Sequence, residues 1–240
     1  MLGKIRVILV ETSHPGNIGS VARAMLNMGL QELYLVSPKN KPNNETIAMA
    51  SGAKGIVENC VIVDTLDDAL VGVNFIVGSS ARSRKASVPM GTLREVVPKI
   101  VKHVELDSKC ALVFGRERTG LYNDELLKCH VHAYIPANQE YSSLNLSQAV
   151  QVFSYELRMH FLNNNIAPHS ESQPIASSEK CIALYDHFEE MLYAISFIKE
   201  ESPGLIMNRI KRLFQRAQLE DVEVNILRGI CKQIIRHRKF

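Results

Sequence analysis

Two glycines and an asparagine stand in the segment ETSHPGNIGSVAR at residues 11–23, after an apolar run and before an apolar helical pattern. Free backbone amides at such a strand-to-helix turn can bind an anion, as they do in phosphate-binding loops. The segment contains neither the G-x-G-x-x-G of dinucleotide sites nor the G-K-[ST] of nucleoside triphosphate loops. Its residues therefore leave two interpretations open, a phosphate-binding turn or a plain turn that caps a helix.

Arg23 follows in the second turn of the predicted helix, with Val21, Ala22, Ala24 and Met25 around it in the sequence. A charge in such a setting usually forms a surface salt bridge. An arginine aimed at a phosphate fits equally well, because the planar guanidinium donates parallel hydrogen bonds to phosphate oxygens.

The segment LVFGRERTGL at residues 112–121 is the second candidate. A predicted buried strand ends on Gly115, where the missing side chain lets a ligand approach the backbone. The charged side chains of Arg116, Glu117 and Arg118 follow at once, and we expect them to face solvent or a substrate.

The third candidate is IPANQEYSSLNLSQA at residues 135–149, a polar segment before a long helical pattern. Ser142 and Ser143 offer hydroxyl groups, and Asn145 offers an amide. Capping of the following helix explains one of these side chains but not all three. We therefore expect this loop to contact a ligand.

Short apolar runs rich in β-branched residues alternate with helical patterns through the first two thirds of the chain. Such runs are typical of buried parallel strands, and the alternation predicts an α/β fold with a doubly wound, mostly parallel sheet. Ligands bind outside the carboxyl ends of such strands, which is where the three loops lie. The predicted strands are 5–10, 33–36, 61–63, 75–77, 111–114 and 131–135, and the main predicted helices are 18–28, 92–103 and 146–162.

A polar stretch with two prolines and no periodicity covers residues 163–176, which is typical of a linker. Beyond it, apolar residues recur at helical spacing from Ile182 to Ile195 and from Leu219 to Ile234. We therefore predict a domain at 1–162, a linker at 163–176 and a small helical extension at 177–240.

Charge is unevenly distributed along the chain. From Asn208 to Phe240 there are nine Lys and Arg against three Asp and Glu, a net charge of +6, whereas the rest of the chain carries −3. Clustered Lys and Arg side chains bind a phosphate backbone favourably because they displace its counterions. The charge distribution is therefore consistent with a polyanionic partner, and equally with a solvated helical tail.

Composition narrows the class of protein. The 240 residues are 46% hydrophobic and 22% charged, as in ordinary globular proteins. The five cysteines are scattered without a C-x-x-C pair, which makes a disulfide framework improbable and favours a cytoplasmic location. Cys129, His130 and His132 lack a fourth nearby ligand, so we expect no metal. The seven-residue apolar run near the start is too short to span a membrane.

The runs NIGSVARAM, LVFGRERTGL and IPANQEYSSLNLSQAV, in that order, resemble the three motifs of the SpoU-type 2′-O-ribose RNA methyltransferases of the SPOUT class. The resemblance covers residues 4–162. The opening LVETSHPGNIGSVARAM, the run GSSARSR at 78–84, and PGLIMNRIKRLFQRA with NILRGI in the tail look closer still to the TrmJ-type bacterial tRNA (cytidine/uridine-2′-O)-methyltransferases.

The resemblance implies an enzyme that transfers a methyl group from S-adenosylmethionine to the ribose of tRNA nucleotide 32, without a metal. It also implies a trefoil knot over residues 110–162 and a homodimer in which the arginine often reaches the partner's site. The implied donor-binding residues are Ser79, Ser80, Ala81, Gly115, Ile135, Ser142, Ser143 and Leu144. The implied catalytic residues are Arg23, Ser143 and Asn145, and the implied RNA-binding residues are Asn17, Arg23, Arg82, Arg84, Glu117, Arg209, Arg212 and Arg216.

Methyl transfer from a sulfonium to a hydroxyl needs in-line alignment and the removal of one proton. Arginine is a poor proton acceptor because its pKa exceeds about 12, so we expect Arg23 to contact phosphate and the developing oxyanion, with its role as a base left open. The alternatives are an RNA-binding module without catalysis, a methyltransferase for another RNA site, and a small-molecule enzyme that uses the same crevice.

Overall fold

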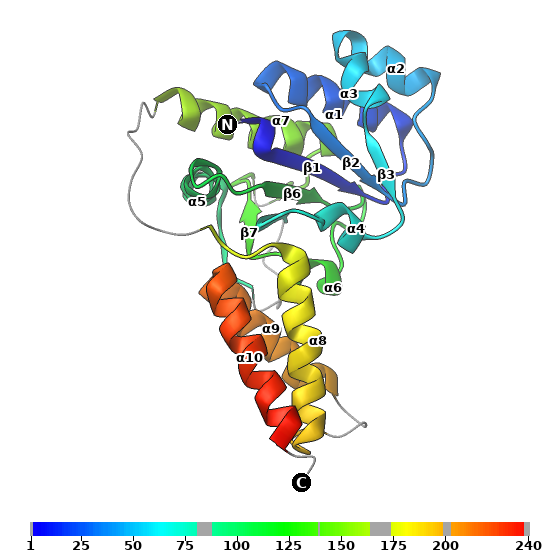
Figure 1. Ribbon diagram of the computed structural model, residues 1–240. Coiled ribbons are helices and arrows are strands. Elements are labelled where there is room, and N and C mark those ends of the chain that lie inside the picture. The colour runs from blue at the N-terminus through cyan, green and yellow to red at the C-terminus, as the bar shows by residue number, and fades with distance from the viewer. Residues whose placement is uncertain (1, 81–87, 139, 164–173, 199–202, 238–240) are drawn as a thin grey trace.

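Seven parallel strands form one sheet in the larger part of the molecule (Figure 1). The structure is a computed structural model that describes residues 2–80, 88–138, 140–163, 174–198 and 203–237. The order across the sheet is β3-β2-β1-β6-β4-β7-β5, and all neighbouring strands run parallel. The strands are β1 (Ile5–Val10), β2 (Glu32–Val36), β3 (Val61–Val63), β4 (Phe75–Ser79), β5 (Met90–Thr92), β6 (Cys110–Phe114) and β7 (Val131–Tyr134).

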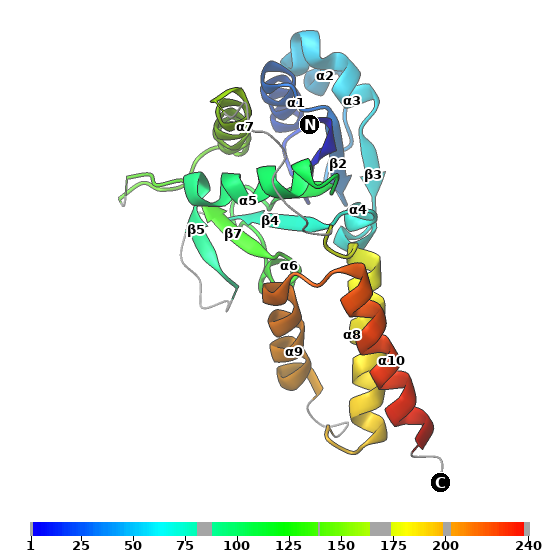
Figure 2. The ribbon, with the colours of Figure 1, turned by 60° about the vertical axis from the view of Figure 1, so that its left-hand side comes forward.

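Helices cover both faces of the sheet, which confirms the predicted doubly wound α/β arrangement (Figure 2). Alternate side chains of a strand point to opposite faces, so Val7 and Leu9 of β1 belong to one core cluster and Ile8 and Val10 to the other. The first cluster packs against α1 (Pro15–Met28), α5 (Leu93–Glu105) and α7 (Leu146–Asn163), and the second against α4 (Leu66–Leu70) and α6 (Asn123–Leu126).

The six predicted strands and three main predicted helices are all present, with bounds that differ by no more than three residues. The prediction missed β5, which has three residues, includes Gly91 and lies at the sheet edge. It also missed four short helices, because segments of four to seven residues are too brief to show a period. Besides α4 and α6 these are α2 (Asn44–Ala50) and α3 (Lys54–Glu58).

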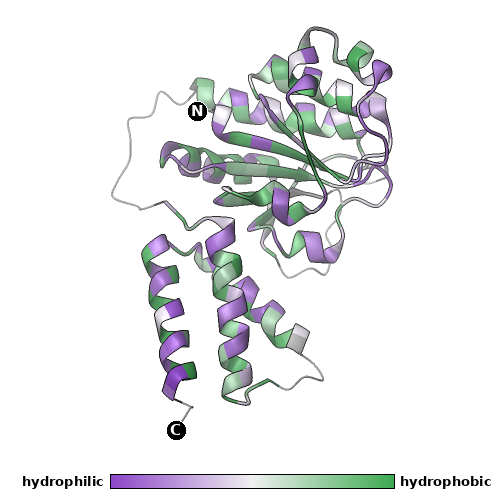
Figure 3. Cartoon of the chain, turned by 45° about the vertical axis from the view of Figure 1, so that its right-hand side comes forward, coloured by the Kyte–Doolittle hydropathy of each residue, from purple (hydrophilic) through white to green (hydrophobic). Residues whose placement is uncertain are grey.

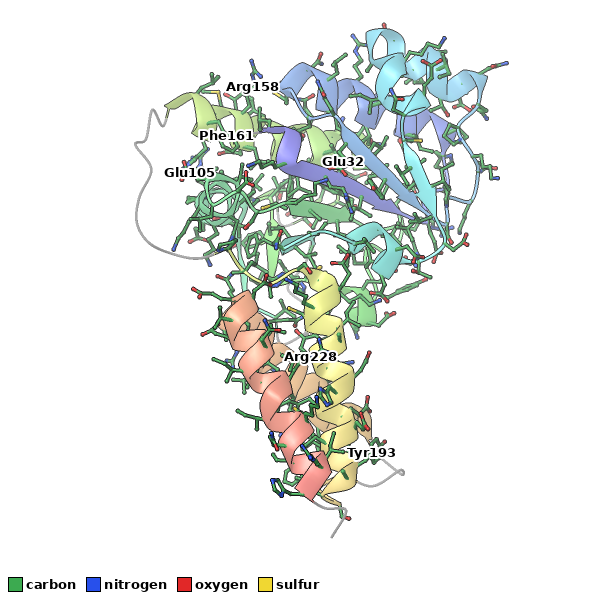
Figure 4. All side chains as sticks on the ribbon, in the orientation of Figure 1. Glu32, Glu105, Arg158, Phe161, Tyr193 and Arg228 are labelled. Atoms are coloured by element: carbon green, nitrogen blue, oxygen red, sulfur yellow. The ribbon has the colours of Figure 1, made fainter. Side chains whose placement is uncertain are left out.

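Close contacts fix the position of α1 and its C-terminal end. Gly29 adopts a left-handed φ of 85° and ends the helix, as glycine commonly does. Arg158 of α7, labelled in Figure 4, donates to the Met28 carbonyl at 3.3 Å. A Cβ atom on Gly19 would overlap the Thr46 carbonyl of α2. These contacts hold α1 beside α2 and α7, and α1 carries the first candidate loop at its start.

Three helices follow the sheet domain and lie below it in Figure 1: α8 (Ser178–Ala194), α9 (Pro203–Ala217) and α10 (Asp221–His237). The start of α8 and the loop before it contact the sheet domain, since Ser178 N donates to Val73 O at 2.8 Å and Asn74 Nδ2 donates to Ile175 O at 2.7 Å. Gln215 of α9 donates to the carbonyl of Leu127, just after α6. The three helices are therefore attached to the sheet at several points.

The middle of the apolar stripe that marked the last helix in the sequence faces outward, whereas Leu219 and Ile234 at its two ends pack against core clusters. Val222, Ile226 and Ile230 are 62%, 58% and 49% exposed. Val224 and Cys231 are buried in the core clusters of the three helices, and the partly buried Leu227 and Ile235 pack beside them. In Figure 3 these helices show mixed hydrophilic and hydrophobic segments, whereas the strands are largely hydrophobic.

Candidate active site

A pocket of about 240 Å³ opens at the carboxyl ends of three strands. β6, β4 and β7 are neighbours in the sheet, so the loops that follow them meet. The volume is slightly below the roughly 300–1,000 Å³ of typical ligand pockets. The pocket is lined by Ser79, Ser80, Phe114, Gly115, Arg116, Glu117, Arg118, Thr119, Gly120, Leu121, Leu126, Ile135, Ser142, Ser143, Leu144, Leu146 and Ala149.

All but one of the implied donor-binding residues line this pocket. The exception is Ala81, which lies outside the described residues, as do Arg82 and Arg84. The sequence reasoning did not single out several lining residues, among them Thr119, Gly120 and Leu121. Their signal was present in the second motif, because a glycine five residues after Gly115 allows a tight turn.

The second motif forms that tight turn. Arg116 and Gly120 exchange two backbone hydrogen bonds of 3.3 and 2.9 Å, and Gly120 has a left-handed φ of 67°. A Cβ atom on Gly115 would lie 2.5 Å from the Gly120 carbonyl oxygen and closer still to its carbon. Glycine is therefore required at residue 115 for the turn to close against the strand end.

Glu117 holds the first candidate loop in place. Its carboxylate accepts hydrogen bonds from Thr12 Oγ1 at 2.8 Å, Ser13 Oγ at 3.0 Å, Asn17 Nδ2 at 3.0 Å and the Ser13 amide at 3.2 Å. Burial raises the pKa of Glu117, but the hydrogen bonds outweigh burial and lower the pKa to about 2. The carboxylate is therefore ionised, and its two oxygens accept hydrogen bonds from residues of the first candidate loop.

Asn145 caps α7 and contacts the same loop. Its Oδ1 accepts from the Ser147 amide at 2.9 Å and from Ser147 Oγ at 2.8 Å, while its Nδ2 donates to Asn17 Oδ1 at 3.1 Å. The capping role expected for one residue of this loop falls to Asn145. Ser142 is half-buried and Ser143 exposed at the pocket, so their hydroxyls are placed to meet a ligand.

Arg23 lies on the exposed side of α1, outside the first pocket. It lines a second pocket of about 480 Å³ between α1 and α7, together with Ser20, Asn27, Leu144, Ser147 and Gln151 among others. Leu144 lines both pockets. The donor residues and Arg23 thus line adjoining pockets that meet at Leu144.

Arg116 does not face solvent or substrate as expected, because its side chain is only 9% exposed. Its Nε donates to Glu11 Oε2 at 3.0 Å, and its Nη1 and Nη2 each donate to Glu125 at 3.0 Å. The guanidinium also lies 3.8 Å from the centre of the Tyr122 ring. The sequence reasoning missed this cluster because Glu11 is 105 residues away in the chain.

The three arginines predicted to bind RNA in the helical extension all lie on α9. Arg209 and Arg216 are exposed, and Arg212 is half-buried. The buried side of the helix includes Met207 and the partly buried Phe214. The exposed arginines therefore share the side of α9 that faces away from the other two helices.

Cys129, His130 and His132 serve the fold. His130 Nδ1 accepts from the Ile76 amide at 3.0 Å, and His132 Nε2 pairs with Leu126 O at 3.2 Å. Within the described ranges, no three Cys, His, Asp or Glu side chains gather as a metal-ligand set would. Within the same ranges, no helix is long and apolar enough to cross a membrane.

Comparison with known proteins identifies the class of protein that this sheet and its three loops define. Residues 4–155 match the SpoU rRNA Methylase family model. The chain therefore belongs to the SpoU methylase family. AviRb, a SpoU methyltransferase from Streptomyces viridochromogenes solved in complex with AdoMet, has a similar fold, with a TM-score of 0.54 and 18% identity over 66% of this chain and 60% of that one.

Within the family, the chain is similar along its whole length to the TrmJ enzymes. Residues 179–239 match the model of the TrmJ C-terminal domain. The tRNA (cytidine/uridine-2′-O-)-methyltransferase TrmJ of Citrobacter koseri is 51% identical over 100% of this chain and 99% of its own. The crystal structure of TrmJ from Z. mobilis ZM4 has a TM-score of 0.83 at 28% identity, covering 95% and 98% of the two chains.

Proposed function

We propose that this protein is an S-adenosylmethionine-dependent methyltransferase that modifies the ribose 2′-hydroxyl of cytidine or uridine at position 32 of tRNA. The observation that carries the proposal is the pair of adjoining pockets, one lined by the donor residues of the SpoU motifs and the other by Arg23. The full-length similarity to TrmJ supports tRNA as the substrate.

The first pocket suits a nucleoside-containing methyl donor. Leu121, Ile135 and Leu144 provide apolar surface, and Ser142 and Ser143 provide hydroxyl groups. Such a mixture is typical of small-molecule sites. The bound donor supplies an electrophilic methyl group, and we assign the chain the tasks of orienting the ribose and accepting the charge that develops on its oxygen.

Arg23 performs the second task in this proposal. Its side chain is exposed beside the donor pocket, where a guanidinium can bind a phosphate through parallel hydrogen bonds and stabilise the oxyanion. Ser143 contacts the substrate. Glu117 and Asn145 position the first turn of α1, since their side chains are both bonded to Asn17 there.

We further propose that the enzyme is a cytoplasmic homodimer and that residues 110–162 form a trefoil knot, as in similar SPOUT enzymes. Exposed apolar side chains on α1 and α7, among them Leu26, Tyr155 and Leu162, support a dimer that covers this face. A second copy there would bring its own Arg23 close to the neighbour's pocket. We retain the division into a catalytic domain at 1–162, a linker at 163–176 and an RNA-binding extension at 177–240.

Two measurements test the function. Calorimetry with S-adenosylmethionine should show donor binding, and labelled methyl groups should enter bulk tRNA. Nuclease digestion and mass spectrometry should then place the 2′-O-methyl group on nucleotide 32. Donor binding without incorporation would favour an RNA-binding module or a small-molecule enzyme. Incorporation at another nucleotide would identify a different RNA site.

A further inference from the structure

We infer that Arg116 is a positioning residue that sets the shape of the donor pocket by tying its turn to the end of β1 and to α6. The inference rests on the proposed function, because it assigns the pocket to the methyl donor. Arg116 is one of the residues that line the pocket, and it begins the turn that ends at Gly120. Its guanidinium points away from solvent, into a cluster formed by Glu11, Glu125 and Tyr122.

The cluster joins three segments that are separate in the chain. Glu11 directly follows β1, Arg116 lies in the turn after β6, and Glu125 belongs to α6. Glu125 also accepts from the Tyr122 amide at 2.6 Å, which fixes the start of α6. The guanidinium of Arg116 therefore determines the distance of the pocket wall from the end of β1 and from α6.

The arrangement requires the shape of an arginine. Nε and Nη2 bond to Glu11, while Nη1 and Nη2 bond to Glu125. A planar guanidinium can bind two carboxylates along two edges, whereas a lysine ammonium is a point charge on a flexible stem. The ring of Tyr122 covers the guanidinium face, so the plane itself is held. Lysine at residue 116 keeps the charge but loses this geometry.

Stability alone does not account for the cluster. Burying the charges of Arg116 and Glu125, which are 9% and 10% exposed, costs free energy that their ion pair does little more than recover. Glu11 also has a left-handed φ of 47°, a conformation that favours glycine. A strained backbone of this kind persists only where many surrounding contacts hold it, and such strain is concentrated at ligand sites.

Arg116 and Glu117 are consecutive and hold different parts of the site. Arg116 fixes the wall of the donor pocket, while Glu117 holds the segment from Thr12 to Asn17 at the start of α1. Substituting Arg116 while retaining Glu117 should therefore disturb donor binding more than tRNA binding. This split distinguishes a positioning role from a general loss of structure, which would weaken both.

The test compares Arg116→Met, Arg116→Lys and wild type by calorimetry. The probes are S-adenosylmethionine, S-adenosylhomocysteine, which cannot transfer a methyl group, and bulk tRNA. We expect Arg116→Met to raise the Kd of both small molecules at least tenfold, with the Kd of tRNA within twofold of wild type. The donor Kd of Arg116→Lys should lie between those of Arg116→Met and wild type. Lys128→Met is the matched control, because it removes the ion pair with Asp67 beside α6 without touching the pocket.

Donor binding by Arg116→Met within twofold of wild type would overturn the inference and leave the proposed function intact. Failure of wild type to bind the donor would overturn the proposed function itself. If Arg116→Met does not fold, Glu11→Gln replaces it. The Glu11 side chain is 38% exposed, and glutamine has the same shape as glutamate without its charge. We then expect at least a threefold rise in donor Kd, and unchanged binding would overturn the inference.

Discussion

Asn145 and Asn17 are joined side chain to side chain at 3.1 Å, although 128 residues separate them. Asn145 is also the N-terminal cap of α7. The start of α7 and the first turn of α1 are therefore held together, and Glu117 bonds to Asn17 and to the loop before α1. The three sequence motifs meet through these bonds, which hold the start of the helix that bears Arg23.

Donor binding and methyl transfer should proceed without a metal. The proposed reaction needs alignment and removal of a proton, which side chains can supply. Protein treated with a chelator should bind S-adenosylmethionine with unchanged Kd and methylate folded tRNA at the wild-type rate. A strict need for a divalent ion in the chemical step, with tRNA folding controlled, would contradict the proposal.

Arg23→Ala should remove most of the catalysis and leave donor binding nearly intact, because Arg23 lies outside the donor pocket. Loss of one charge-assisted contact to a developing oxyanion costs about 2.7–4 kcal/mol, or a factor of about 100–1,000 in kcat. Arg94→Ala is the control, since it removes an exposed arginine paired with Glu156. A variant that keeps more than half the wild-type rate at saturating tRNA would refute this role.

Mixed dimers test whether Arg23 acts on the partner's site. Gly115→Ala is the second parent, because its Cβ would overlap the backbone of Gly120 and deform the donor pocket. If Arg23 acts on the partner's site, co-expressed Arg23→Ala and Gly115→Ala chains should regain activity that neither has alone. Half of the dimers formed by random pairing are mixed, and each mixed dimer has one intact site of two, so the expected rate is up to about a quarter of wild type. Absence of recovery in confirmed mixed dimers would place Arg23 in its own chain's site.

The arginines of α9 should contribute to the salt dependence of tRNA binding. Each phosphate contact contributes about 0.9 to the slope of log affinity against log salt on duplexes and about 0.7 on single strands. Arg212→Ala with Arg216→Ala should therefore flatten the slope by about 1.4–1.8 and spare the helix, because alanine has high helix propensity. Lys54→Ala with Arg94→Ala removes the same charge elsewhere. Equal slopes for wild type and both double variants would show that the positive charge of the C-terminal segment does not bind tRNA phosphates.

Truncation at residue 177 is a poorer test of the same idea. The extension is bonded to the sheet domain through Ser178 and Gln215. Its removal would leave Val73 and Leu127 carbonyl groups without these partners. Any change in tRNA binding would then mix lost charge with altered structure.

Acid should destabilise the sheet domain through His103 and His130. Both rings lie against Phe75, with centroids 4.3 and 5.4 Å away. Burial lowers the pKa of each from 6.5 to about 4. The unfolded chain therefore binds protons between these values while the folded chain does not, so stability is complete near neutral pH and falls as the pH drops below 6.5.

The expected loss is on the order of 2 kcal/mol per histidine at about pH 5. Thermal or urea unfolding from pH 7.5 to 4.5 measures it. His103→Gln should give a shallower dependence on pH, whereas the matched variant His14→Gln, at an exposed residue, should follow wild type. Parallel profiles for all three proteins would show that His103 is not responsible.

Most of the fold could be predicted from the sequence because the signals are local. An apolar β-branched run such as 5–10 or 75–77 indicates a buried strand without reference to its neighbours. Val150, Phe153 and Leu157 recur at helical spacing and are all buried on α7. The short strand β5 and helices such as α6 lacked this signal, because they hold fewer residues than one clear period.

The sequence by itself determined which loops carry the candidate chemistry, since glycine, serine and charged residues follow predicted strands at 115–121 and 135–149. Only the tertiary structure decided that Arg116 is buried, that Glu117 serves the chain's own loop, and that Ile226 faces outward. The physical reason is distance along the chain. Glu11 and Thr12 meet these side chains across more than 100 residues, and whether a charge faces solvent or a buried partner depends on such contacts.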